Sequence, residues 1–84
     1  MSDNDKIIDI EFHYEKIKKQ IKANIKVTII EIIKKSNFDF LKDKNYIIIS
    51  HDKKIKQDEI IESIMTREDK KNKKLKIILL PLNN

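Results

Sequence analysis

The segment over residues 28–35, TIIEIIKK, decides the fold that the sequence predicts. It opens with a capping box, in which the Thr28 hydroxyl accepts from the Glu31 amide and the Glu31 carboxylate accepts from the Thr28 amide. Two lysines close the segment, where the helix dipole favours cations. The apolar side chains that helical spacing places on one face are Ile29, Ile32 and Ile33. We therefore expect one amphipathic helix over about 28–36, with its apolar face against a sheet.

Two sheet-forming segments precede this helix. Apolar and polar residues alternate over 6–13, with Ile8, Ile10 and Phe12 on one side, which is typical of a half-buried strand. A turn at 14–16 leads to a second strand over about 18–25. Its core-side residues would be Ile21, Ala23 and Ile25, and its outward residues Lys18, Gln20 and Lys22, opposite Glu11 and Asp9. Such charged pairs across a hairpin contribute about 0.2–1 kcal/mol each.

Two further strands are expected after the helix. YIIIS at 46–50 lies between polar turns, and the strand over 75–80 ends at Pro81, which cannot donate to a ladder. We expect the first and last strands to be parallel and adjacent. Asp58 is expected to cap a short helix that reaches Met65, and residues 66–74 to form a charged loop. Three apolar residues outside these elements are expected to fold back into the core, namely Phe38, Phe40 and Leu41.

Composition limits the chemistry that the chain can perform. Its 84 residues predict one domain over 6–82 after a disordered 1–5. The absence of cysteine excludes disulfides and thiolate metal sites. The absence of glycine excludes the usual phosphate-binding loop. Turns that need a positive φ must then use Asn, Asp or strained Lys, and the natural candidates are Asn37, Asn45 and Asn72. No segment has the pattern of a signal peptide or membrane span, which favours a cytoplasmic or cytoskeleton-associated protein.

The net charge of +5 has a simple compositional source. Isoleucine, lysine and asparagine fill 44 of the 84 positions, and one arginine accompanies 18 lysines. All three amino acids have A/T-rich codons, so an A/T-rich genome explains the bias. The lysine clusters lack interleaved aromatic residues for base stacking, and a single arginine is too few for the usual base-edge contacts. Nucleic acid is therefore not the expected partner.

The order of the elements resembles the ubiquitin-like β-grasp family over nearly the whole chain. The resemblance rests on HDKKI at 51–55 after the third strand, on the short helical segment at 58–65, and on KLKIIL at 74–79 in the last strand. It implies an α+β fold, with a mixed four- to five-stranded sheet and one main helix packed across it. It also implies a docking domain. Because the family's glycines are missing and the chain ends LNN, we do not expect conjugation through a Gly-Gly tail.

No residue pattern predicts an enzyme or a cofactor. Ser50, His51 and Asp52 are adjacent, but neighbouring residues at a strand end point in different directions, which is not the geometry of a catalytic triad. The only other histidine, His13, is far away in the sequence, so a metal site is not expected either. The sequence predicts no catalytic residue, no cofactor and no small-molecule substrate.

Consecutive isoleucines in the third and last strands predict an exposed apolar patch. If Ile48 and Ile77 face the core, alternation places Ile47, Ile49 and Ile78 on the opposite face. His51 and Lys76 would lie at its rim. Exposed apolar patches usually mark docking sites, and in ubiquitin the main recognition patch includes outward residues of the same two strands. The sequence therefore predicts a protein-interaction or scaffold module that docks by this patch, with weak self-association as one mode, and we expect it to be the N-terminal part of a larger protein.

A basic face is the alternative. Ras-binding domains of the same fold pair a basic second strand with a GTPase, and doublecortin-type domains bind the acidic microtubule surface. The lysines that would serve in this way are Lys16, Lys18, Lys19 and Lys22, assisted by Lys34 and Lys35. The acidic surface would be a Ras-like GTPase, a microtubule or an anionic membrane. Salt separates the two hypotheses, because a basic face predicts a steep loss of binding with ionic strength.

Overall fold

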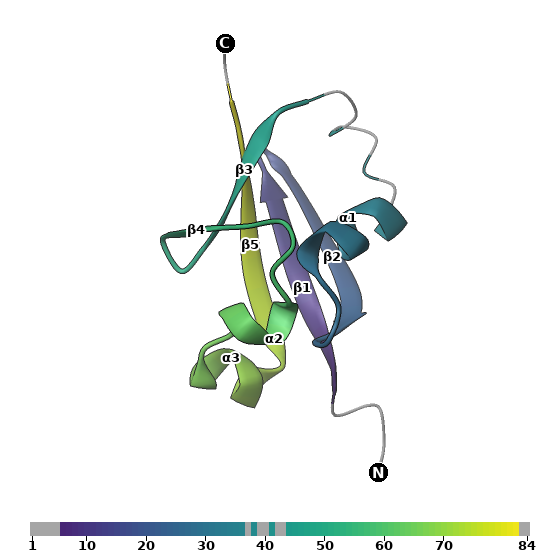
Figure 1. Cartoon of the computed structure of the whole chain (residues 1–84), viewed down its shortest axis with the longest axis vertical. Helices are drawn as coiled ribbons and strands as arrows, with labels where there is room; N and C mark the ends of the chain where they lie inside the picture. Colours follow the sequence, from purple (N-terminus) through teal and green to yellow (C-terminus); the bar gives the residue numbers. More distant parts are fainter. Residues whose placement is uncertain (1–5, 37, 39–40, 42–43, 83–84) are drawn as a thin grey trace.

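A computed structural model describes residues 6–36, 38, 41 and 44–82. Residues 1–5, Asn37 and Phe40, for which the sequence predicts disorder, a cap and a core contact, lie outside this set. The described chain forms one mixed sheet in the order β2-β1-β5-β3-β4, with helix α1 across one face (Figure 1). The strands are β1 (Ile7–Tyr14), β2 (Ile17–Asn24), β3 (Tyr46–Ser50), β4 (Lys53–Ile55) and β5 (Lys74–Pro81). The α+β class, the mixed sheet and the main helix are confirmed.

The β1–β2 hairpin has the predicted pairing. Asp9 lies opposite Lys22 and Glu11 opposite Gln20, in an antiparallel ladder that ends at Tyr14 and Ile17. The turn holds only Glu15 and Lys16, so β2 begins and ends one residue earlier than predicted. The hairpin therefore presents one row of alternating side chains to the core and the other to the opposite side of the sheet.

The last strand lies at the centre of the sheet. β5 pairs in parallel with β1, placing Phe12 opposite Ile77, and antiparallel with β3, placing Ile49 opposite Ile78. The predicted parallel contact between the first and last strands is confirmed. β4 is a short edge strand that covers only the second half of β3.

Helix α1 (Ile29–Ser36) begins at the predicted capping box. The Thr28 amide donates to the Glu31 carboxylate over 3.0 Å, and the Glu31 amide donates to the Thr28 hydroxyl over 3.3 Å. The three predicted isoleucines of its apolar face are buried against the sheet. Figure 1 shows α1 lying over the β1–β2 side of the sheet. Within the described residues, α1 is the longest helix, and it covers this one face of the sheet.

The core lies between α1 and the sheet. Its fully buried side chains are Phe12, Ile10, Ile29, Ile61, Ile77 and Leu79. Between α1 and β3 in the sequence, Phe38 and Leu41 are buried in this core, as predicted. The Phe38 ring meets the Phe12 ring edge to face, with 5.2 Å between centroids, a favourable aromatic geometry.

The predicted Asp58 cap is wrong. The short helix α2 (Ile61–Ile64) begins three residues after Asp58. Its N-cap residue is Ile60, whose side chain makes no capping hydrogen bond. Backbone pairing with the loop before α1 sets this start: the Ile61 amide donates to Val27 O over 2.9 Å, and the Glu62 amide donates to Ile25 O over 2.8 Å. Ile60 consequently lies outside the helix and is exposed.

The predicted loop at 66–74 is also wrong, because it contains a third helix. Helix α3 (Arg67–Asn72) begins with a second capping box, in which the Asp69 amide donates to the Thr66 hydroxyl and the Thr66 amide donates to the Asp69 carboxylate. The helix carries no buried residue, so no apolar periodicity marks it in the sequence. Figure 1 shows α2 and α3 together beside the start of β5.

Positive φ angles fall on other residues than the predicted asparagines. Within the described residues they belong to Glu15, His51, Asp52 and Lys73, and not to Asn45 or Asn72. Glu15 lies in the β1–β2 turn, and His51-Asp52 is the two-residue turn between β3 and β4. Lys73 is the left-handed cap of α3. The strand register decides where a tight turn falls, and without glycine the residue that occupies that position adopts the left-handed conformation.

Candidate docking surface on the outer face of the sheet

The two faces of the sheet differ in what covers them. Ile48 of β3 and Ile77 of β5 are 4% and 0% exposed and point toward α1. Alternation therefore places Ile47, Ile49 and Ile78 on the opposite side, which we call the outer face. These three side chains are half-buried there, because neighbouring side chains of the same face cover part of each. The predicted facing agrees with this burial pattern, but the predicted full exposure of the three isoleucines is wrong.

Strand pairing brings these residues together. Ile49 lies directly opposite Ile78, and Ile47 lies opposite Leu80, which is 45% exposed. We call these four residues the outer-face patch. The sequence analysis missed Leu80, although it has the same parity along β5 as Ile78. The alternation of inward and outward side chains along β5 was therefore the signal that could have identified Leu80.

One row of the sheet crosses the patch from edge to edge. The register aligns Lys18 of β2, His13 of β1, Ile78 of β5, Ile49 of β3 and Lys54 of β4. The apolar pair at the centre is therefore flanked by a histidine on one side and by a lysine at each end. The sequence analysis did not identify this flank, because it depends on the registers of four separate strand pairs.

His13 is the polar residue closest to the centre of this row. Its side chain is 19% exposed, and its Nε2 lies 3.1 Å from Glu11 Oε1. This contact lacks hydrogen-bond geometry, since His13 Nε2 is a buried atom without a hydrogen-bond partner among the described residues. Of the causes that lower the pKa of Glu11, the neighbouring His13 ring comes first. The His13 ring and the Glu11 carboxylate thus lie within ion-pair distance on the outer face.

The predicted rim residues His51 and Lys76 are both exposed. Together with Ile49 and Ile78 they line a small hollow beside the patch. The His51 ring is held to α3, because its Nε2 lies 2.6 Å from Asp69 Oδ2. Both residues therefore lie where the sequence analysis expected them, although the contact of His51 with α3 was not foreseen.

No catalytic triad forms from the run Ser50-His51-Asp52. Ser50 is 3% exposed, and its hydroxyl donates to Lys76 O over 3.1 Å. His51 contacts Asp69 instead of either sequence neighbour. The three residues thus point into the core, toward α3 and into a tight turn.

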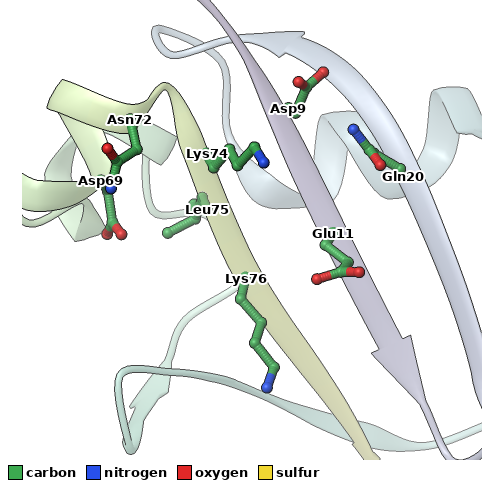
Figure 2. A pocket seen from close by; sticks show the side chains of 8 residues that line it. All are labelled: Asp9, Glu11, Gln20, Asp69, Asn72, Lys74, Leu75 and Lys76. Carbon is green, nitrogen blue, oxygen red and sulfur yellow. The ribbon is translucent and has the colours of Figure 1, made fainter.

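The other half of the outer face is polar. A hollow of about 500 Å³ lies there under α3, and Figure 2 shows its side chains on β1, β5, β2 and α3. They are Asp9, Glu11, Gln20, Asp69, Asn72, Lys74, Leu75 and Lys76. Its three carboxylates already have partners: Lys22 at 3.0 Å from Asp9, His13 beside Glu11 and His51 beside Asp69. The Lys22 hydrogen bond lowers the pKa of Asp9. In the part of the chain that the structure describes, no three candidate ligands gather around a metal position.

The lysines of the alternative basic face do not share one surface. Lys18 and Lys22 lie opposite His13 and Asp9 on the outer face, whereas Lys19 lies opposite buried Phe12 and is therefore on the helix side. Lys16 is in the hairpin turn, and the remaining two, Lys34 and Lys35, end α1. All six are exposed. They surround the β2 edge of the molecule instead of forming one basic plane.

Solved structures resemble the whole described fold. A ubiquitin of Caldiarchaeum subterraneum superposes with a TM-score of 0.66 at 12% identity, covering 93% of this chain and 96% of that one. A structure described as "Molecular Mimicry of SUMO promotes DNA repair" gives 0.62 at 8% identity, over 89% and 91% of the two chains. The N-terminal ubiquitin-like domain of the 4931431F19Rik protein gives 0.60 at 11% identity, over 100% and 83%. The fold is thus the ubiquitin-like β-grasp.

Sequence comparison does not detect these similarities. No family model matches it, and no curated protein matches it. At identities of 8–12% the likeness is one of fold alone. Among the described residues, no helix has the length and apolar character needed to cross a membrane.

Proposed function

We propose that this ubiquitin-like β-grasp domain is a non-enzymatic protein-interaction module that docks through the outer-face patch. The observation that carries the proposal is the pairing of Ile49 with Ile78 and of Ile47 with Leu80 on the sheet face that α1 does not cover. Contiguous apolar side chains rimmed by polar ones mark interaction sites more often than chance exposure does. Central apolar residues also contribute most of the energy in such interfaces.

Several features support a role without catalysis. The serine that adjoins His51, Ser50, is buried, and its hydroxyl donates to Lys76 O instead of to a histidine. The absence of glycine supports a domain that is not conjugated, which stays a prediction. We further propose that this domain is the N-terminal part of a larger protein, as the solved N-terminal ubiquitin-like domain of similar fold is, and that this protein works in the cytoplasm.

Site-specific photo-crosslinking in the source cells tests the proposal. A benzophenone side chain replaces Leu80 in one variant and Ile60 in a matched control, since the two are 45% and 44% exposed but Ile60 lies before α2, away from the patch. We expect discrete protein adducts from position 80 that disappear when Ile49→Glu is added. Equal adducts from both positions, or none from position 80, would contradict docking at the patch.

Docking of a basic face to an acidic surface is the second candidate. It is supported by β2, a sheet-edge strand whose lysines, together with Lys16 of the adjoining turn, are exposed. Such binding falls steeply with salt because exposed charges are screened beyond about 8 Å at physiological ionic strength. Binding to anionic vesicles, microtubules and a GTP-loaded GTPase at 50 and 300 mM salt, for wild type and Lys19→Glu, measures this candidate directly.

A further inference from the structure

We infer that helix α3 is a strap that opens as a unit while the rest of the domain stays folded, and that the His51–Asp69 contact is the clasp that holds it closed. Three properties of α3 carry this inference, independently of the docking function proposed above. No buried side chain anchors the helix, its cap and its clasp share one oxygen atom, and the backbone conformation changes immediately before and after it.

The first property is the lack of an apolar anchor. All six residues of α3 are polar or charged, and none of them is buried. By contrast, α1 buries three isoleucines and α2 buries Ile61. Helices shorter than about 12–15 residues are marginal in water, and packing of an apolar face supplies most of their stability in proteins. Polar contacts must therefore hold α3 in place.

The cap and the clasp of α3 meet at one atom. Asp69 Oδ2 accepts a hydrogen bond from the Thr66 amide over 2.9 Å and lies 2.6 Å from His51 Nε2. The first contact belongs to the capping box that starts the helix, and the second ties the helix to the turn between β3 and β4. Because the same carboxylate oxygen serves both, formation of the helix and its attachment to the turn favour each other. The segment is then either capped and clasped, or open.

The backbone on both sides of α3 suits such an opening. Thr66, before the helix, is extended, with φ −86° and ψ 172°. Lys73, after it, is left-handed, with φ 55° and ψ 40°, a conformation that is unfavourable for a residue with a Cβ atom. The Lys73 carbonyl stays with the sheet, because the Asp9 amide donates to it over 3.0 Å. Residues at the ends of elements commonly act as hinges, and opening of α3 lets Lys73 leave the left-handed region.

Opening of the strap changes two hollows of the outer face. Asp69 and Asn72 line the α3 side of the polar hollow, across from side chains of β1 and β5 (Figure 2). His51 lines the small hollow beside Ile49. The clasp thus contributes one residue to each hollow, and both hollows change when it breaks. The strap therefore controls the shape of this part of the outer face without any change in the core.

Native-state amide hydrogen exchange on the intact 84-residue chain, followed by NMR, tests the inference. The strap is reported by three amides that donate within it, those of Asp69, Lys70 and Lys73. We expect these amides to be at least about tenfold less protected than core amides of β1 and β5. Their exchange should also depend little on denaturant, because opening of α3 exposes little surface. Equal protection with an equal denaturant dependence would mean that α3 opens only when the whole domain unfolds, and would overturn the inference.

Two variants separate the strap from the core. Ile48→Val is a small truncation of the core and should lower the protection of core amides about three- to tenfold. It should leave the strap amides within about twofold of wild type, because the strap opens without the core. His51→Asn removes the ring but suits the left-handed turn, and should lower the protection of the strap amides about fivefold. Equal losses in strap and core for Ile48→Val would overturn independent opening, and an unchanged strap in His51→Asn would overturn the clasp.

His13→Asn is the matched control. It removes the other contact between a histidine and a carboxylate on the outer face, which joins His13 to Glu11 and involves no residue of α3. The strap amides should stay within about twofold of wild type in this variant. A loss of strap protection equal to that of His51→Asn would mean that neither effect comes from the clasp, and would overturn its assignment to His51 and Asp69.

Discussion

The ring of His51, in the turn between β3 and β4, lies against the Asp69 carboxylate of α3, with 2.6 Å between Nε2 and Oδ2. Burial alone would raise the pKa of Asp69, but the hydrogen bonds from the Thr66 backbone and the His51 ring outweigh it and lower that pKa. A carboxylate whose pKa is lower in the folded state stabilises the fold above its unfolded pKa of about 3.9. That stabilisation is lost as pH falls through the folded value.

Asp69→Asn should therefore reduce the amount by which the free energy of unfolding falls at acid pH. The asparagine oxygen can still accept from the Thr66 amide, so the variant removes the charge and keeps the cap. Urea unfolding midpoints between pH 7 and pH 2.5 measure the effect, with Glu68→Gln, an exposed neighbour on the same helix, as the control. We expect the gap between wild type and Asp69→Asn to close toward low pH. A gap of constant size would mean that the carboxylate charge contributes nothing.

The α1 capping box gives a second prediction. Thr28→Ala removes the acceptor of the Glu31 amide and should destabilise the domain by about 1 kcal/mol. Thr28→Ser keeps the hydroxyl and should recover most of that loss. Thermal unfolding of the three proteins, followed by circular dichroism, compares them. Similar losses for serine and alanine would show that the threonine methyl, and not the cap, stabilises the helix start.

The parts of the fold that the sequence predicts are those with local signals. The capping box at Thr28, the alternation in β1 and the isoleucine runs identified four strands, the main helix and the burial of Ile48 and Ile77. Helix α3 was not predicted because its residues are all polar or charged, so that only the Thr66–Asp69 capping box indicates it. The start of α2 was predicted wrongly because backbone hydrogen bonds to residues distant in the sequence, and not a local cap, determine it.

The residues of the candidate site also fall into those that a local pattern predicts and those that it does not. Alternation alone places Ile47, Ile49 and Ile78 on one face. The flanking of the patch by His13, Lys18 and Lys54 depends on which residue of each strand lies opposite which, and no local pattern encodes that register. The His51–Asp69 contact likewise requires α3, which the sequence analysis took for a loop. Contacts between elements distant in the sequence determine the strand register and the His51–Asp69 contact, and composition and periodicity do not encode such contacts.

Phe38 supplies a third prediction, because it belongs to the core without belonging to a helix or strand. It is 6% exposed and meets Phe12 edge to face. Phe38→Ala should cost about 3–5 kcal/mol, as large-to-small changes in cores do. Leu82→Ala, at a site 48% exposed, is the control and should change stability by less than about 1 kcal/mol. Chemical denaturation measures both. Near-equal effects would show that the segment between α1 and β3 does not pack on the sheet.

The sharpest prediction concerns two neighbours on β3 that face opposite ways. Ile48 is 4% exposed in the core, so Ile48→Ala should destabilise the domain by roughly 2–5 kcal/mol. Ile49 is half-buried on the outer face, so Ile49→Ala should cost about 1 kcal/mol or less. Binding should respond in the opposite order, because central apolar residues of an interface dominate its energy. Ile49→Ala should thus reduce the crosslinking from position 80 while the domain stays folded. Denaturation curves of both variants, and crosslinking from position 80 in each, decide the question. A larger stability loss for Ile49→Ala would reverse the facing of β3, and unchanged crosslinking would remove Ile49 from the interface.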